Sequence, residues 1–294
     1  MLEQQSSGSR TTGTGTTSSR TTADGLAVLT WNTHHADPER SERQAKWLAG
    51  SGADVLVLTE VDGGHDRLET ALREEGFSLL TSAPAPYHRG EHLVLAARGH
   101  HLEPVDLPPP RYQPHRCVAA RLIPPSAGTP LTLAGMYVPS RGGTSRRHND
   151  KRAFKQAGSQ WLPRLLATAG DELVVVAGDL NLLEPGEVRH YQDYGPWEYD
   201  FYWSFAKMGL ADAYRVVHPE AIVPRRWFGR LSARGGRFEH LFVSRAHAGL
   251  VSACAYDEEP RDDALSEHAA LWMCVDQPAP ARRPRPNIHR GWMP

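Results

Sequence analysis

The stretch ELVVVAGDLN, residues 172–181, decides the fold prediction. Its apolar run from Leu173 to Ala177 predicts a buried strand, and the polar residues after Gly178 end that strand in a turn. LAVLTWN (26–32) and ADVLVLTE (53–60) follow the same pattern, since in each of them an apolar run stops at a polar residue. Strands of this kind need a covering layer, so the sequence predicts a packed sheet rather than an isolated hairpin.

Working outward from these strands, the chain alternates irregularly between strands and helices. Asp37 and Pro38 predict the N-cap and first turn of a helix that ends near Gly50. Other helices are expected at residues 65–75, 150–169 and 198–209. Shorter strands are expected in FSLLT, HLVLAAR, CVAARLI, LTLAGMYV and HAALWMCVD. RFEHLFVS and LVSACAY are expected to pair as a hairpin around Gly249.

This order is neither a strict βαβα repeat nor all-β, and it predicts an α/β (α+β) fold of two packed sheets with helices outside. One domain is expected over residues 26–276. Residues 1–25 are rich in Ser, Thr and Gly, and residues 277–294 are rich in Pro and Arg. Both segments are expected to be disordered tails, because they cannot bury enough apolar surface to fold.

The 294 residues carry 33 Lys and Arg against 34 Asp and Glu, which excludes a cationic field over the whole molecule. A local basic groove remains possible. No apolar run reaches the length of a membrane span, and the N-terminal stretch lacks the apolar core of a secretory signal. The three cysteines lie in apolar segments without metal-binding spacing, which favours buried thiols in the reducing cytoplasm.

Polar side chains stand where the buried strands end. They are Asn32, Glu60, Tyr137, Asp179 and Asn181, and they are joined near the C-terminus by His268. Side chains at strand ends tend to converge at one edge of a sheet, where a site can form. Oxygen donors dominate this set, so it suits Mg²⁺ or Mn²⁺ better than zinc.

Six motifs carry a resemblance to a known family. LTWNTHH, DVLVLTEV, GMYVPS, VVVAGDLN, RFEHLFVS and LSEHAALW occur in an order and spacing that resembles the endonuclease/exonuclease/phosphatase superfamily. The exonuclease III and apurinic endonuclease type is the most similar branch. The resemblance spans about residues 26–276, and it implies a four-layer α/β/β/α sandwich of two mixed sheets that hydrolyses phosphate esters with a divalent metal.

The resemblance also implies roles for individual residues. It places Glu60 and Asn32 at the metal, and Glu267 matches a further acidic position of the metal site. Asp179 matches the aspartate that generates or orients the attacking water. The other catalytic matches are Asn181 beside Asp179, His268 at the phosphoryl oxygens, Glu239 as the carboxylate that orients His268, and Tyr137 on the phosphate or leaving-group side.

Several positions depart from the family's pattern. His34 stands where an acidic residue is common, and Ser140 stands where an asparagine is common. Glu239-His240 replaces the usual Asp-Tyr, and Glu267 replaces the aspartate before His268. A glutamate keeps the charge but moves the carboxylate by about one bond length, ~1.5 Å, unless the backbone compensates. The late half of the site is therefore expected to differ in rate, metal preference or substrate.

Two basic runs bear on the substrate. Arg141, Lys151 and Arg152 belong to the first run, and Arg225, Arg226, Arg230, Arg234 and Arg237 belong to the second run. Arginines with nearby aromatic residues suit nucleic-acid phosphates and bases, so Arg141, Lys151, Arg152 and Arg237 are expected to contact substrate phosphate. The same runs are also compatible with ordinary solvated loops.

A monomeric nuclease that cleaves DNA rather than RNA, without a membrane partner, is therefore expected. Two alternatives remain open, namely a phosphatase or phosphodiesterase acting on a small-molecule or lipid phosphate, and a catalytically degenerate nucleic-acid-binding member.

Overall fold

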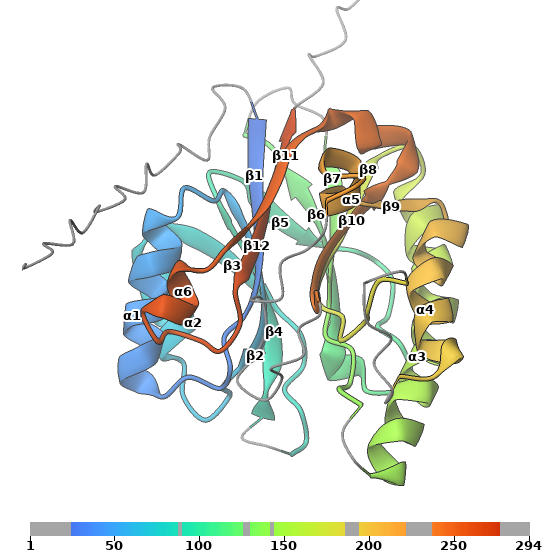
Figure 1. Ribbon diagram of the computed structural model, residues 1–294. Helices are drawn as coiled ribbons and strands as arrows, with labels where there is room; N and C mark the ends of the chain where they lie inside the picture. Colours follow the sequence, from blue (N-terminus) through green and yellow to red (C-terminus); the bar gives the residue numbers. More distant parts are fainter. Residues whose placement is uncertain are drawn as a thin grey trace, which may run out of the picture.

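The computed structural model describes residues 25–87, 90–125, 130–141, 144–185, 194–221 and 237–276. Two six-stranded sheets lie face to face, and helices cover the outer face of each (Figure 1). The expected α/β/β/α sandwich is confirmed. The arginines at 225, 226, 230 and 234, and both predicted tails apart from Gly25, lie outside the described residues.

The first sheet has the strand order β11-β12-β1-β2-β4-β3. Its strands are β1 (Gly25–Asn32), β2 (Val55–Val61), β3 (Phe77–Thr81), β4 (His92–Arg98), β11 (Val251–Asp257) and β12 (Ala270–Asp276). Strands β1 and β2 run parallel, whereas β1 and β12 run antiparallel, so this sheet is mixed.

The second sheet has the order β5-β6-β7-β8-β10-β9. Its strands are β5 (His101–Pro104), β6 (Cys117–Ile123), β7 (Leu131–Met136), β8 (Leu173–Asp179), β9 (Leu210–Asp212) and β10 (Glu239–Ser244). Strands β7 and β8 are parallel and the other pairs are antiparallel. The two short strands β5 and β9 were not expected from the sequence.

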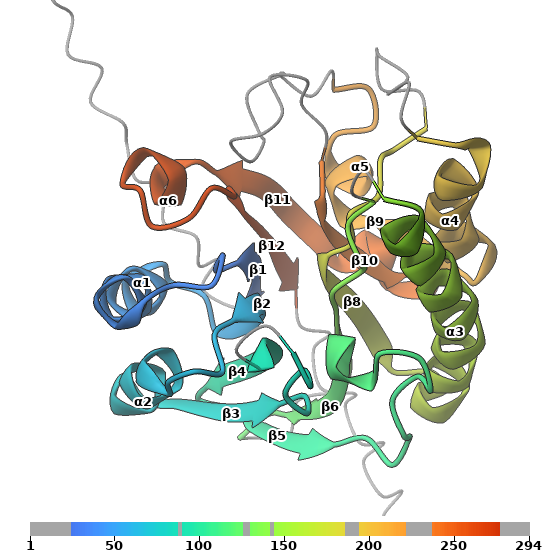
Figure 2. The ribbon, with the colours of Figure 1, turned by 90° about the horizontal axis from the view of Figure 1, so that it is seen from below.

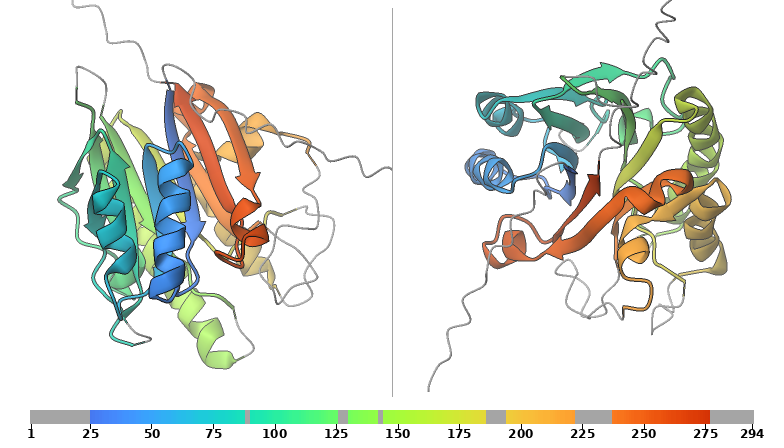
Figure 3. Two further views of the ribbon diagram at one scale, coloured as in Figure 1. Left: turned by 90° about the vertical axis from the view of Figure 1, so that its left-hand side faces the viewer. Right: turned by 90° about the horizontal axis from the view of Figure 1, so that it is seen from above.

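The first sheet is covered by α1 and α2, and the second by α3 and α4 (Figures 2 and 3). The helices are α1 (Pro38–Gly50), α2 (Arg67–Glu74), α3 (Ser145–Ala169), α4 (Pro196–Lys207), α5 (Ala213–Val217) and α6 (Glu259–Asp262), with 3₁₀ turns η2 (Pro114–Arg116) and η3 (Arg245–Leu250). The predicted cap of α1 is confirmed, because the Asp37 side chain accepts a 2.8 Å hydrogen bond from the N–H of Arg40.

Among the described residues, none of the helices combines the length and apolar composition that a bilayer crossing requires.

Three apolar clusters hold the four layers together. Alternate residues of one strand serve different clusters: Val28 packs between the two sheets, and Leu29 packs under α1 and α2. On the other sheet Val175 faces the centre, and Val176 faces α3 and α4. Both faces of the central strands are therefore buried, which explains why their sequences are continuous apolar runs rather than alternating ones.

The expected hairpin between residues 237–244 and 250–256 is wrong. Strand β10 pairs with β8 and β9 in the second sheet, whereas β11 pairs with β12 in the first. The 3₁₀ turn η3, which contains Gly249, carries the chain from one sheet to the other. Periodicity identified both strands correctly but did not specify their partners.

Candidate active site

The strand ends bring the predicted polar residues to one edge of the sandwich. Asn32 is the last residue of β1, and Asp179 is the last residue of β8. Glu239 opens β10 and stands directly opposite Asp179 in the antiparallel register. Gly178 allows this strand end to lie close to β7, because a Cβ at Gly178 would come within 1.9 Å of the carbonyl oxygen of Met136.

Asp179 is buried and held by two hydrogen bonds. The Nδ2 of Asn32 donates to its Oδ2 at 2.9 Å, and the backbone N–H of Asn181 donates to its Oδ1 at 2.9 Å. Burial, and then the neighbouring Glu239 carboxylate, raise the pKa of Asp179 above its ordinary value. The site thus concentrates negative charge around a carboxylate that hydrogen bonds fix in place.

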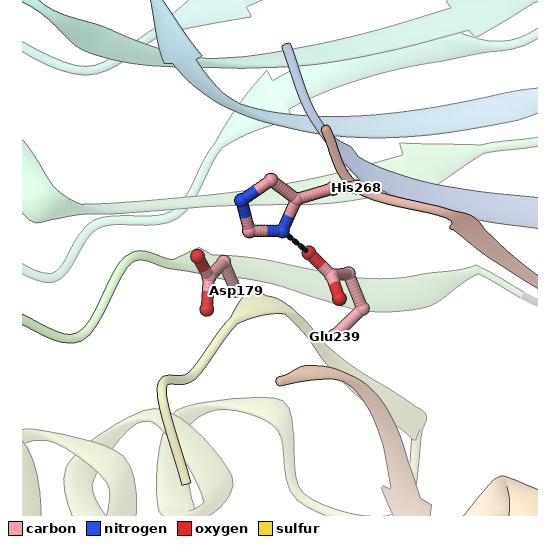
Figure 4. A group of neighbouring side chains, drawn as sticks. All are labelled: Asp179, Glu239 and His268. Carbon is pink, nitrogen blue, oxygen red and sulfur yellow. Dashed lines mark hydrogen bonds and ion pairs between the residues drawn. The ribbon is translucent and has the colours of Figure 1, made fainter. Parts of the chain in front are cut away.

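His268 lies beside Asp179 and is oriented by Glu239. Its Nδ1 is 2.5 Å from the Oε1 of Glu239, and the Asp179 carboxylate lies beside the same ring (Figure 4). Trp31 fixes the backbone here, because its Nε1 donates to the carbonyl oxygen of His268 at 2.9 Å. Burial lowers the pKa of His268, but the carboxylates of Glu239, Asp179 and Glu60 outweigh burial and raise that pKa, which favours the imidazolium.

Glu60 sits in an irregular part of β2, where the register with β4 shifts between Leu58 and Val61. Its backbone is left-handed, with a φ of 55°, a conformation that costs energy for a residue with a side chain. The Tyr137 hydroxyl donates to its Oε1. Burial would raise the pKa of Glu60, but hydrogen bonds from Tyr137 and Asn32 outweigh burial and lower it, so this carboxylate is ionised.

Glu60 also belongs to a closed ring of interactions that joins both sheets. The Nε2 of His35 lies 3.3 Å from an oxygen of Glu60 and 3.3 Å from an oxygen of Glu91. Arg116 donates to the other oxygen of Glu91 at 3.0 Å, and its guanidinium lies 4.2 Å from the ring centre of Tyr137. Because Tyr137 donates to Glu60, the ring closes, and it fixes the Glu60 carboxylate from several directions.

The donor set fits a divalent cation. Ligand atoms of Asp179, Glu239 and His268 lie within 4.8 Å of one another. Because a protonated His268 has no free lone pair, the carboxylate oxygens would hold the ion. Glu60 adds an ionised carboxylate, which is close enough to raise the pKa of both Asp179 and His268. A dication would relieve the repulsion that raises the pKa of Asp179, and hard oxygen ligands are those that Mg²⁺ and Mn²⁺ take.

Two of the three expected metal ligands are placed differently. The Oδ1 of Asn32 accepts a 2.9 Å hydrogen bond from the N–H of His34, and its amide nitrogen points to Asp179. Asn32 therefore positions Asp179 in this structure instead of turning its oxygen to an ion. Glu267 is partly exposed, and its carboxylate lies 4.0 Å from the Nε2 of His34, outside the group formed by the buried ligand atoms.

His34 enters the site from the loop after β1. Its ring centre is 6.4 Å from that of His268, and burial lowers the pKa of His34. His34, His35, Glu60 and Asn181 all have left-handed backbones, with φ between 46° and 55°. Residues with side chains adopt this conformation only where the surrounding structure imposes it, and such strain concentrates at functional sites.

Two of the expected phosphate contacts are corrected by burial. The ammonium group of Lys151 is completely buried and bonds Glu198 at 2.7 Å and the carbonyl oxygen of Asn181 at 2.8 Å. Arg237 is equally buried and bonds Asp212 at 2.6 Å and Glu184 at 2.9 Å. Neither side chain can reach a substrate, so both act by holding the loops that carry the site.

The other two basic residues lie nearer the surface. Arg152 is exposed and lies 4.9 Å from the ring centre of Trp197. Arg141 is partly exposed and lies 3.5 Å from Glu198. These two positions are compatible with contacts to a long substrate.

Sequence reasoning assigned no role to Glu91, Arg116 or His35. A usable signal existed for Glu91, because it directly precedes β4. Since β4 runs antiparallel to β2, the start of β4 lies at the edge where β2 ends. Nothing local marks Arg116, whose partners come from distant segments.

Comparisons with known proteins bear on the family and the fold. Residues 29–268 match the Endonuclease/Exonuclease/phosphatase family. No curated protein sequence matches the chain. Among solved structures, an AP endonuclease from Archaeoglobus fulgidus superposes with a TM-score of 0.69 at 20% identity, covering 85% of this chain and 99% of that one.

Two further structures share the fold. A 3′ phosphatase NExo variant from Neisseria, bound to a product DNA hairpin, has a TM-score of 0.67 at 21% identity and covers 85% of this chain and 99% of its own. The AP endonuclease LMAP from Leishmania major has a TM-score of 0.67 at 18% identity, with 87% and 89% covered. The match over most of its length, together with the shared four-layer fold, shows that this chain belongs to the Endonuclease/Exonuclease/phosphatase family.

Proposed function

We propose that this protein is a divalent-metal-dependent nuclease that hydrolyses phosphodiester bonds in DNA. The observation that carries the proposal is the pairing of two units at one sheet edge: Asp179 held by Asn32, and His268 held by Glu239. The Asp179 carboxylate can accept a proton, and the His268 ring can donate hydrogen bonds to an anion. Hydrolysis of a phosphate ester needs both of these abilities.

Asp179 is suited to orient and deprotonate a water molecule. Its carboxylate is fixed through both oxygens, and its raised pKa makes it a stronger base than an exposed aspartate. A fixed base lowers the entropic cost of placing the water for attack on phosphorus.

His268 is suited to bind the phosphoryl oxygens. Glu239 holds its Nδ1, so the opposite ring nitrogen is left to face the substrate. Because the raised pKa keeps the ring protonated at neutral pH, it places a positive charge and a donor where negative charge develops. A bound Mg²⁺ or Mn²⁺ would supply further neutralisation of the phosphate charge next to the carboxylates of Glu60, Asp179 and Glu239.

Two observations favour a DNA substrate over other phosphate esters. Solved structures with the same fold include two AP endonucleases and a 3′ phosphatase bound to a product DNA hairpin. The exposed guanidinium of Arg152 and the partly exposed one of Arg141 suit the backbone of a polyanion.

A substrate panel tests this function. The purified protein is incubated with abasic duplex, nicked duplex, single-stranded DNA, RNA, inositol phosphates, sphingomyelin and p-nitrophenyl phosphate, each with Mn²⁺ and with EDTA. We expect metal-dependent cleavage of a DNA substrate, and a steep loss of that cleavage as salt rises. Selective turnover of a small or lipid phosphate would replace the nuclease with a phosphatase, and DNA binding without any turnover would indicate a degenerate member.

Two matched variants assign the chemistry. Asp179→Asn and His268→Ala are expected to lower kcat by about 10²–10⁴-fold, the range found for general acid–base and electrostatic groups, while circular dichroism stays unchanged. Asp171→Asn, at an exposed position outside the site, serves as the control.

A further inference from the structure

A cavity of about 900 Å³ opens directly beside the candidate active site. It shares four wall residues with the ring described above, namely His35, Glu91, Arg116 and Tyr137. Its other walls come from the loop before β4, from the segment around η2 and from the start of α3. The residues used below are Tyr87, Tyr112, Gln113, His115, Arg146 and Arg147. The volume lies in the range that holds a small ligand or one unit of a polymer.

The aromatic walls of the cavity are held rigidly. The Tyr87 hydroxyl and the Nε2 of His115 are 3.1 Å apart, and their rings meet edge to face with centres 5.4 Å apart. Tyr87 is still 40% exposed, which few large apolar side chains are in the part of the chain that the structure describes. Tyr112 is fixed on another wall by a 2.6 Å hydrogen bond to Asp150. Fixed aromatic faces in a cavity suit a flat, stackable group such as a nucleobase.

The polar groups of the cavity suit recognition of a base edge. Gln113 has a left-handed backbone, with a φ of 50°. Its buried Oε1 has no hydrogen-bond partner within the described ranges, so it can still accept one. Burial lowers the pKa of His115 to about 4, so its ring is neutral at pH 7.

Arg146 and Arg147 line the side of the cavity formed by the start of α3. Both are exposed and lie in the first turn of this 25-residue helix, which holds no acidic residue in that turn. Cations at this end of a helix oppose the helix dipole, so they do not contribute to helix stability. An anion bound there would interact favourably with both arginines and with the helix terminus.

We propose that this cavity binds one unpaired nucleotide next to the scissile phosphate, with its base against Tyr87, Tyr112 and Gln113 and its phosphate at Arg146 and Arg147. The inference rests on the proposed function and specifies its substrate. A base in a walled cavity cannot remain stacked and paired in a duplex. The protein therefore acts on single strands, frayed ends or flaps in preference to fully paired DNA.

The preference is tested first by binding, which does not require turnover. A fluorescein-labelled single-stranded 10-mer and its blunt duplex are titrated with protein in EDTA, and anisotropy is recorded. We expect tighter binding of the single strand, and a loss of about tenfold on Tyr87→Ala, which is the size of one base-stacking contact. Gln113→Ala removes a hydrogen-bond acceptor for the base edge and should weaken binding by about tenfold or less. Tyr87→Phe keeps the ring and should retain most of the affinity. Trp203→Ala removes an exposed aromatic on α4 and serves as the control.

Turnover gives the second measurement. The ratio of kcat/KM on the single strand to kcat/KM on bis(p-nitrophenyl) phosphate, which has no base, should fall about tenfold in Tyr87→Ala and in the Arg146→Ala/Arg147→Ala double variant. Equal binding of single strand and duplex, or unaltered binding and ratios in these variants, overturns the cavity assignment. Selective binding of the single strand without hydrolysis of any ester would refute the proposed function and retain the nucleotide site.

Discussion

The Nδ1 of His268 lies 2.5 Å from the Oε1 of Glu239. At position 239 the sequence pattern of the family usually has an aspartate. The longer side chain still reaches the imidazole, and the strand register places Glu239 opposite Asp179. The pair is thus built for glutamate in this protein.

This pair predicts that restoring the more usual aspartate is harmful. Glu239→Asp withdraws the carboxylate by about 1.5 Å from His268, so the imidazole loses its orientation and part of its charge. We expect kcat on the best substrate to fall about 10–100-fold, with KM changed less. Steady-state kinetics measures this fall, with Glu103→Gln on the exposed edge strand β5 as control. An Asp variant as active as the parent would show that the length of this side chain is unimportant.

Metal binding should stabilise the fold measurably. Asp179 carries a raised pKa because it is buried near Glu239, and a dication would remove that repulsion. Thermal unfolding should therefore shift to higher temperature with 1–5 mM Mn²⁺ relative to EDTA, following the logarithmic dependence of ligand linkage. The shift should shrink in Asp179→Asn and in Glu60→Gln and persist in Asp171→Asn. Equal shifts in all of these proteins would place the ion elsewhere.

The buried Lys151–Glu198 pair should matter for stability rather than for substrate affinity. Lys151→Met removes the nearer and fully buried cation from the Glu198 carboxylate and leaves only Arg141 at 3.5 Å, and we expect a loss of about 3–5 kcal/mol in the free energy of unfolding. Lys151→Met/Glu198→Leu should recover much of that loss, because no isolated charge remains. Arg152→Ala, one residue further along α3 and exposed, should cost less than about 1 kcal/mol. Urea denaturation of the four proteins decides between these outcomes.

His115 should make the protein less stable in mild acid. Its pKa is about 4 in the folded state and 6.5 when exposed, so the unfolded chain binds the proton first as pH falls. The stabilisation is complete above pH 6.5 and is lost progressively between pH 6.5 and 4. Between pH 7 and 4.5 the protonation of His115 should lower the free energy of unfolding by about 2 kcal/mol.

The check for His115 is the slope of stability against pH. His115→Gln cannot titrate, so its free energy of unfolding should fall less over the same interval than that of the parent protein. His101→Gln, at an exposed position on β5, should follow the parent. A His115→Gln variant with the parent's pH dependence would mean that His115 is not held neutral by burial.

The sequence predicted that Asn32, Asp179 and His268 would lie together, because Asn32 and Asp179 end buried strands, strand ends converge, and all three residues stand in family motifs. Other features depend on contacts that no local pattern encodes. Lys151 looks like a surface lysine in the sequence, and only its meeting with Glu198, from another helix, shows that it is buried. The pairing of β10 and β11 failed for the same reason, since periodicity identifies strands and not their neighbours.

Strand β1 lies between β2 and β12. The first strand of the fold is therefore paired with the last one. As a ribosome synthesises the chain from the N-terminus, β2 becomes available early, but the other side of β1 has no partner until residues 270–276 emerge. For most of synthesis the nascent chain therefore exposes an unpaired, apolar strand edge, which is a template for aggregation. Cotranslational chaperone binding should consequently concentrate on the β1 region and end once β12 has been released.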